Sequence, residues 1–377
     1  SVLTFFISKK IKLYFFISII SLVSTLYLYE IYSRFNQNIL ESKALQTREK
    51  LKNFDNRSIH EVLSLARAKG LEVQYPVFPF LFLEKKNIKL YPLTGSSNTN
   101  IIYCNENGFF TKFSSDRFGF NNPDDVWEKQ SVEYLILGDS YAYGNCVNRP
   151  NDVSSVLRKI SKKNSINLGQ SGIGPLIEYA ILSEYYPNNV KKVIWLYYEG
   201  NDIGDLIFEL RNDFLMQYIT EKNFSQNLKS KQNDINKIVG EIDLKRSQAK
   251  TKSKFSSLKE FIKLKNLRTQ IFPSKVKIPI EFEEILKLTQ NLTQKNQSEL
   301  IFVYLPEYSR LNKNFKNENY SKVKSIVKKL NIKFIDANEE LLKRDNPRKF
   351  WPKHIENGHF SEKGYSELAK LIFDQTN

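Results

Sequence analysis

The chain has 377 residues, of which 41% are hydrophobic, 13% aromatic and 26% charged, a composition that excludes a protein disordered along its whole length. Its 57 lysines and arginines exceed its 41 aspartates and glutamates, so the net charge is +16. Residues 209–277 alone hold 16 basic and 7 acidic residues. Because the charge is concentrated there, and the sequence carries no helix-turn-helix or RNA-binding signature, we expect no nucleic-acid partner.

The N-terminal region contains a stretch typical of a membrane span. Residues 13–29 carry no charged side chain, and three lysines precede them: Lys9, Lys10 and Lys12. Roughly 17–25 apolar residues cross a bilayer, and a basic flank favours a cytoplasmic N-terminus. A signal peptide and a helix buried in a core are the alternatives. No small-residue cleavage pattern follows, so we predict an uncleaved transmembrane anchor over residues 1–35.

Residues 36–128 are predicted to form a stalk and then a leading segment rich in short strands and loops, packed on the domain that follows. This segment holds Cys104, one of only two cysteines in the chain, and Cys146 is the other. If the chain is exported, an oxidising compartment favours a disulfide between them. Two separate buried thiols are the alternative.

From residue 129 to the C-terminus the chain alternates between short apolar runs and helix-length segments. This alternation predicts a parallel sheet with crossover helices. We expect strands at 133–138, 165–168, 192–198, 299–305 and 332–336. Helices are expected near 152–162, 175–187, 203 onward, 280–297, 319–330 and 361–375. Residues 209–277 interrupt the pattern and read as a basic insertion of one or two exposed helices. A solvated appendage is favoured there over a lid or a contact with anionic headgroups.

Three of the predicted strands end in small or polar residues. Ser140 lies in Gly-Asp-Ser, Gly172 in Asn-Leu-Gly-Gln-Ser-Gly and Asn201 in Gly-Asn-Asp. In an open parallel sheet, sites form beyond the carboxyl ends of the strands, so these residues are expected to lie close together. His359 falls in a loop before the last helix. A serine nucleophile, a histidine base and amide donors can together carry out acyl transfer.

These four residues, in four ordered sequence blocks, resemble the SGNH/GDSL hydrolases. The resemblance covers roughly residues 130–205 and 350–377, and it implies a flavodoxin-like three-layer sandwich. It also implies that Ser140 is the nucleophile, that His359 is the base, and that Gly172 and Asn201 complete the oxyanion hole.

The family's last block usually reads Asp-x-x-His, whereas this chain has Glu356 three residues before His359. Glu356 is therefore predicted to orient the imidazole. Asn357, a backbone carbonyl or a distant acid such as Asp345 are alternatives. No paired histidine or cysteine spacing suggests a metal, and no phosphate-binding glycine loop suggests a nucleotide, so neither a metal nor a cofactor is expected.

The sequence thus predicts a membrane-anchored, extracytoplasmic serine esterase. Acyl esters, O-acetyl esters above all, on envelope glycans or lipids are the expected substrates. The bacterial inner membrane and its periplasmic side are the expected location, where an envelope protein could be a partner. An O-acyltransferase with a sugar acceptor is one alternative, and a catalytically inactive binding or assembly subunit is another.

Overall fold

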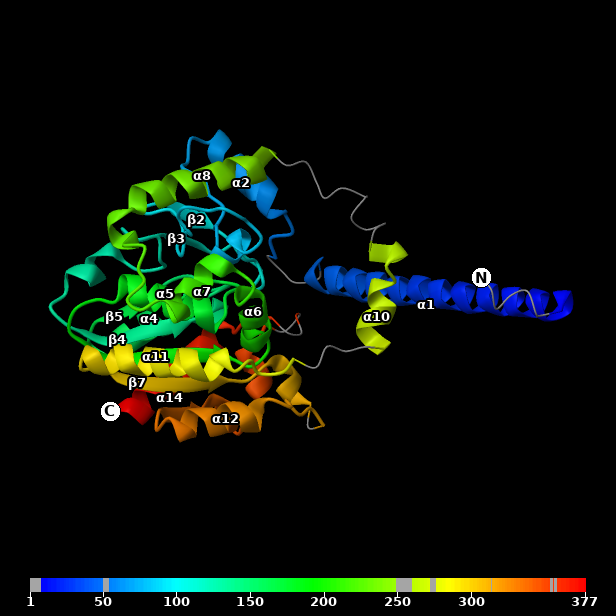
Figure 1. Cartoon of the computed structure of the whole chain (residues 1–377). Coiled ribbons are helices and arrows are strands. Elements are labelled where there is room, and N and C mark those ends of the chain that lie inside the picture. The colour runs from blue at the N-terminus through cyan, green and yellow to red at the C-terminus, as the bar shows by residue number, and fades with distance from the viewer. Residues whose placement is uncertain are drawn as a thin grey trace. The chain divides into compact units, whose positions relative to one another are not determined.

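The computed structural model describes residues 8–49, 54–248, 260–271, 276–312, 314–352, 355 and 358–377 (Figure 1). It contains two compact units. One comprises residues 1–52 and 249–275, and the other comprises residues 53–248 and 276–377. The second unit holds all of the residues singled out above as a candidate site.

The larger unit is built on a sheet of five parallel strands in the order β5-β4-β6-β7-β8. Its strands are β4 (Val132–Gly138), β5 (Ser165–Asn167), β6 (Val190–Tyr198), β7 (Glu299–Leu305) and β8 (Lys333–Asp336). Counted along the chain this order is 2-1-3-4-5, which is that of flavodoxin-like folds. The strand order reverses between β4 and β6, so the crevice at their carboxyl ends is the expected place for a ligand.

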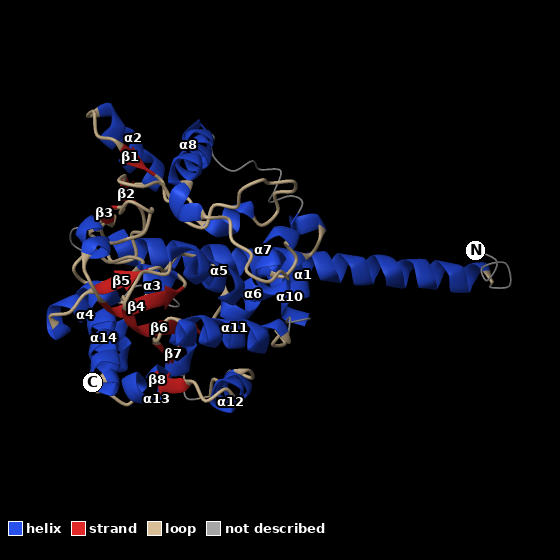
Figure 2. Cartoon of the chain, turned by 60° about the vertical axis from the view of Figure 1, so that its left-hand side comes forward, coloured by secondary structure: helices blue, strands red, loops and turns tan. Residues whose placement is uncertain are grey.

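Helices cover both faces of this sheet, which gives three layers (Figure 2). One face is packed by α5 (Pro175–Tyr185), α11 (Glu281–Lys295) and α12 (Tyr320–Lys329). The other is packed by α4 (Val153–Ser161), α13 (Ala337–Leu342) and α14 (Glu362–Thr376). Strands buried on both faces need apolar residues at successive positions, as in Leu135, Ile136 and Leu137, which are fully buried. The predicted strands, crossover helices and three-layer architecture are confirmed.

The segment before β4 forms a small three-stranded sheet and several short helices. Its strands are β1 (Val73–Gln74), β2 (Asn100–Ile102) and β3 (Lys112–Ser114), in the order β1-β2-β3. They follow helix α2 (Ile59–Ala68), and one-turn helices span Pro79–Phe82 and Asp124–Glu128. Strands β2 and β3 pair antiparallel, and Thr111 N–H donates to Cys104 O at 3.0 Å, so residues 103–111 form the tip of a hairpin.

The basic insertion is not the solvated appendage that we expected throughout its length. Helix α6 (Asp202–Glu209) leads into the insertion, and helices α7 (Asp213–Thr220) and α8 (Gln232–Gln248) within it belong to the larger unit. Leu215, Ile235 and Val239 from this stretch are buried in its core. The expectation was wrong because these apolar residues are scattered among lysines and asparagines in the sequence. Their burial becomes visible only in the folded structure.

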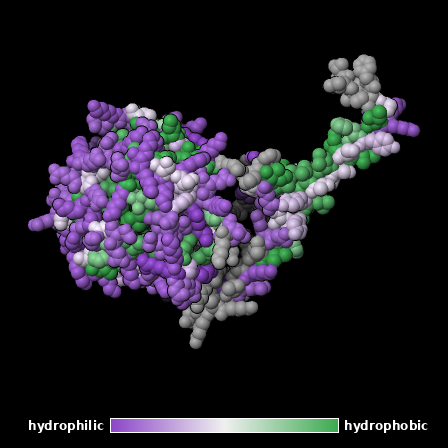
Figure 3. All heavy atoms as spheres, turned by 90° about the horizontal axis from the view of Figure 1, so that it is seen from below, coloured by the Kyte–Doolittle hydropathy of each residue, from purple (hydrophilic) through white to green (hydrophobic). Residues whose placement is uncertain are grey.

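The smaller unit contains helix α1 (Lys9–Glu49) and helix α10 (Lys265–Ile271) of the insertion. Residues 9–39 of α1 are long and apolar enough to cross a membrane, and their hydrophobic side chains are visible in Figure 3. A membrane anchor and a signal sequence both fit this helix. α10 packs against α1: the buried Glu30 carboxylate accepts hydrogen bonds from Asn266 N–H at 3.3 Å and Leu267 N–H at 3.0 Å.

Candidate active site

Ser140 is the first residue of the short helix α3 (Ser140–Tyr143), at the turn that follows β4. Gly138 has φ +145°, and a Cβ there would come within 2.5 Å of Leu196 O, so this turn requires glycine. The Asp139 side chain caps α3 by accepting from Tyr141 N–H at 2.9 Å. Its other oxygen accepts from Ser140 Oγ at 3.0 Å. The hydroxyl is therefore held at the carboxyl end of a central strand, beside the switch point.

Asp139 is fully buried. Burial raises the pKa of Asp139, whereas the Tyr141 N–H and the nearby His359 lower it. Since its two oxygens already bind Tyr141 and Ser140, we assign Asp139 the task of shaping the turn.

Gly172 lies in the loop between β5 and α5, with φ +71°. A Cβ on Gly172 would lie 2.8 Å from the Phe80 ring, so the glycine is required by both its backbone conformation and its neighbour. Glu209 holds the end of this loop, because its carboxylate accepts hydrogen bonds from Gly174, Leu176 and Ile177 N–H. Burial raises the pKa of Glu209 to about 8, and these backbone donors oppose the rise.

Asn201 stands immediately before α6, at the carboxyl end of β6. It makes no side-chain cap. Its Nδ2 donates to Asp205 Oδ2 at 2.7 Å, while its Oδ1 is buried without a hydrogen-bond partner in the described part of the chain. Burial, followed by the charge of Asp139, raises the pKa of Asp205 to about 6. Because Oδ1 can only accept, Nδ2 is the group that Asn201 can offer to an oxyanion.

His359 reaches the same region from the loop before α14. Its ring centroid lies 5.4 Å from that of Tyr141, the residue after Ser140, and its Nε2 lies 3.2 Å from Asn145 Nδ2. Asn145 in turn donates its backbone N–H to Ser140 O at 3.0 Å. Among the described residues no hydrogen bond joins His359 to Ser140, whose Oγ faces Asp139 instead. In unliganded sites such catalytic bonds are often not yet formed.

Glu106 is the acid that contacts this histidine, and sequence reasoning missed it. Its Oε1 lies 3.0 Å from His359 Nδ1, and its Oε2 accepts from His359 N–H at 2.6 Å. Of the residues that we considered for this role, Glu356 and Asn357 lie outside the described residues. Asp345 is exposed. The predicted disulfide between Cys104 and Cys146 was the sequence signal that could have pointed to Glu106, because it brings the residues around Glu106 close to the Ser140 turn.

The structure joins Cys104 and Cys146 by a disulfide bond. With Glu106 and His359, the two cysteines form a cluster whose ligand atoms lie within 4.8 Å of one another. Because the two sulfurs are bonded to each other, they are not thiolate ligands in this structure, and the cluster offers no zinc-like set of donors.

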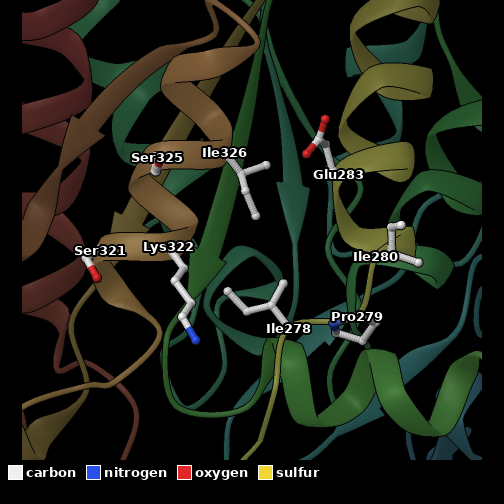
Figure 4. A pocket seen from close by; sticks show the side chains of 8 residues that line it. All are labelled: Ile278, Pro279, Ile280, Glu283, Ser321, Lys322, Ser325 and Ile326. Carbon is white, nitrogen blue, oxygen red and sulfur yellow. The ribbon is translucent and has the colours of Figure 1, made fainter.

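The described residues also line a hollow of about 430 Å³ between the start of α11 and α12, shown in Figure 4. Ile278, Ile280, Lys322 and Ile326 are among its lining residues. None of the four residues predicted to form the site lines it, so we do not assign it to the acyl-transfer chemistry.

No protein-family model and no curated protein matches this chain. Solved structures align with part of it. A protein of the G-D-S-L family from Desulfitobacterium hafniense is 16% identical, covering 64% of this chain and 98% of that one with a TM-score of 0.35. An acetylxylan esterase from Geobacillus stearothermophilus is 15% identical, covering 65% and 93% with a TM-score of 0.35. A lipase/acylhydrolase from Enterococcus faecalis is 12% identical, covering 65% and 94% with a TM-score of 0.34. These values are too low to carry an argument about activity, which is inferred from the residues of the site.

Proposed function

We propose that this protein is a serine ester hydrolase of the SGNH/GDSL type, with Ser140 as nucleophile and His359 as base. The observation that supports the proposal is that Ser140, Gly172 and Asn201 follow the carboxyl ends of β4, β5 and β6, which are neighbouring strands at the switch point. His359 approaches that edge from the C-terminal loop.

In the proposed reaction Ser140 Oγ turns from Asp139 to His359 and attacks the ester carbonyl. Its proton passes to His359 Nε2 as the Oγ–carbon bond forms. The carbonyl oxygen becomes an oxyanion, which the backbone N–H groups of Ser140 and Gly172 and the Asn201 amide stabilise. The alcohol then leaves with the proton from His359. Attack by water on the acyl-serine completes the hydrolysis.

We further propose that the substrates are acyl esters, chiefly O-acetyl esters, on glycans or lipids outside the cytoplasm. The apolar helix α1 supports this location, because it is suited to anchoring the chain in a membrane, with its basic flank on the cytoplasmic side. We therefore propose that, in a bacterial cell, the larger unit lies in the periplasm.

The full chain in detergent micelles, treated with a fluorophosphonate probe, tests the nucleophile. We expect labelling of the wild type and none of Ser140→Ala. A folded wild type that stays unlabelled would overturn the catalytic proposal and favour a binding or assembly role.

Short acyl esters of p-nitrophenol then test turnover, with and without an added sugar acceptor. Release of acetate with water as acceptor supports a hydrolase. If acetyl transfer requires the sugar, the protein is instead an O-acyltransferase that acts through the same serine.

A further inference from the structure

The two nitrogens of His359 face different kinds of partner. Nε2 faces the side-chain amide of Asn145 at 3.2 Å. Nδ1 faces the Glu106 carboxylate at 3.0 Å. Because an ionised carboxylate can only accept, a neutral His359 in this contact carries its proton on Nδ1 and its lone pair on Nε2. This is the tautomer that a general base needs in order to receive a proton at Nε2.

Glu106 binds the histidine at two points, which fixes the ring as well as its proton. Besides Nδ1, it accepts the backbone N–H of His359 at 2.6 Å. Gly358 leaves space for this approach, since a Cβ there would lie 2.9 Å from Glu106 Oε2. Each side chain of the pair is only 24% exposed, so water screens the interaction weakly.

Three contacts fasten the hairpin that carries Glu106 to residues 146–148, beyond the Ser140 turn. The disulfide joins Cys104 to Cys146. Asn107 Nδ2 donates to Cys146 O at 2.8 Å, and Lys112 N–H donates to Asn148 Oδ1 at 2.8 Å. The hairpin tip is therefore tied to the chain that leaves the nucleophile, and the carboxylate comes with it.

We infer that Glu106, presented by the disulfide-tethered hairpin of the leading segment, is the residue that positions His359 for catalysis. This inference rests on the proposed function, because it supplies the acid that the serine and histidine require. It replaces Glu356, the acid predicted from the C-terminal block. Glu106 touches neither substrate nor nucleophile, so it is a positioning residue.

The remaining groups around His359 do not take this role. Asp139 lies close enough to interact with the imidazole by charge, but its oxygens bind Ser140 and Tyr141. Tyr141 presents its ring to the histidine, and Cys146 its bonded sulfur at 3.6 Å from Nδ1. Of the described groups, Glu106 alone holds both the ring and the backbone N–H of His359.

The kinetic test compares Glu106→Gln, Glu106→Asp and Glu356→Gln in the full chain in detergent. For Glu106→Gln we expect kcat for p-nitrophenyl acetate to fall about 10²–10⁴-fold with KM within about threefold of wild type. Glu106→Asp should recover part of the loss, and Glu356→Gln should stay within about threefold of wild type.

A spectroscopic test reads the contact itself, whether or not the protein turns over substrate. The chain has 3 histidines, so histidine-selective ¹⁵N labelling gives a simple spectrum. We expect a downfield Nδ1–H proton signal that disappears in Glu106→Gln and in His359→Ala, and that survives in Glu356→Gln. In the double variant Cys104→Ser/Cys146→Ser the signal should weaken, and kcat should fall less than in Glu106→Gln.

The outcomes separate this inference from the proposed function. If the fluorophosphonate labels wild-type Ser140 but Glu106→Gln keeps wild-type kcat and its downfield signal, the positioning role is wrong and the esterase proposal stands. If Glu356→Gln instead loses both kcat and the downfield signal, Glu356 is the residue that positions His359. A folded wild type without labelling overturns the function on which the inference rests.

Discussion

The two halves of the candidate site are built in different ways. On the nucleophile side, Ser140 and Asn201 follow directly on the adjacent strands β4 and β6, and helices cover both strand faces. On the base side, His359 and Glu106 lie in loops 253 residues apart in the chain and meet through side-chain contacts and a disulfide tether. The sheet positions one half, and pairwise contacts position the other.

This difference teaches where the site is robust and where it is adjustable. A residue at the end of a buried strand moves only if the core moves, and close-packed cores resist such shifts. A histidine held by one carboxylate depends on that carboxylate. We therefore expect substitutions on the base side to change activity with little change in stability, and those on the nucleophile side to affect both more often.

The largest effect is expected for His359→Ala, because this substitution removes the proposed general base. Turnover of p-nitrophenyl acetate should fall about 10²–10⁴-fold, the usual contribution of a general base. His60→Ala is the matched control, because His60 is exposed and its contact is with Tyr75, in the leading segment. Equal activity of the two variants would remove His359 from the mechanism.

Asn201→Ala tests the nucleophile side at its second strand. Losing one oxyanion donor costs about 10²–10³-fold in kcat. Its melting temperature should fall as well, because Asp205 loses the hydrogen bond that Asn201 Nδ2 donates at 2.7 Å. Asn212→Ala should affect stability alone, because Asn212 caps α7 through Leu215 N–H at 3.0 Å; we expect a loss of about 1 kcal/mol in stability and full activity. A fully active Asn201→Ala would show that the amide is structural.

Gly172→Ala examines the third position of the sheet edge with a smaller expected loss. The alanine would have to keep the left-handed backbone conformation of Gly172, and its Cβ would press on Phe80. We expect the protein to lose about 1–3 kcal/mol in stability. We expect kcat to fall roughly tenfold as the backbone donor shifts. Gly70→Ala is the control, with φ +77° but no atom within 4 Å of its Cβ, and it should lose stability without losing activity.

The smallest expected effect is a change in how stability depends on pH, caused by Glu209, which binds the loop before α5. Its folded pKa of about 8 exceeds the ordinary 4.5, so the folded protein binds a proton that the unfolded chain releases between these values. Stability from this group is fully present below the lower value and declines with rising pH, by at most about 1.4 kcal/mol per pH unit. Glu209→Gln should flatten that decline in urea unfolding measured from about pH 5 to about pH 8. An unchanged slope would contradict the assignment.

The positions of Ser140 and Asn201 after strand ends could be predicted from the sequence, because strand ends and glycine turns are local signals. The pattern of apolar runs located β4 to β8 within one or two residues, and the polar residues after them followed. The base side was predicted only in part. His359 stood out among 3 histidines, but Glu106 is one of 41 acidic residues, and only the folded hairpin brings it to the imidazole. The burial of α7 and α8 was missed for the same reason, since it depends on long-range packing.

The Glu30 carboxylate that binds the start of α10 has a consequence for how the protein could leave a membrane. The chain passes between its two units three times, between α1 and α2, between α8 and α10 and between α10 and α11, since α10 belongs with α1. A cut before or after α10 leaves α1 covalently attached to the larger unit, whereas a cut between α1 and α2 does not. Removal of α1 as a cleaved leader would also strip the buried Glu30 from Asn266 and Leu267. After a cut between α1 and α2, the packing of α10 on α1 is therefore what still holds the larger unit to α1.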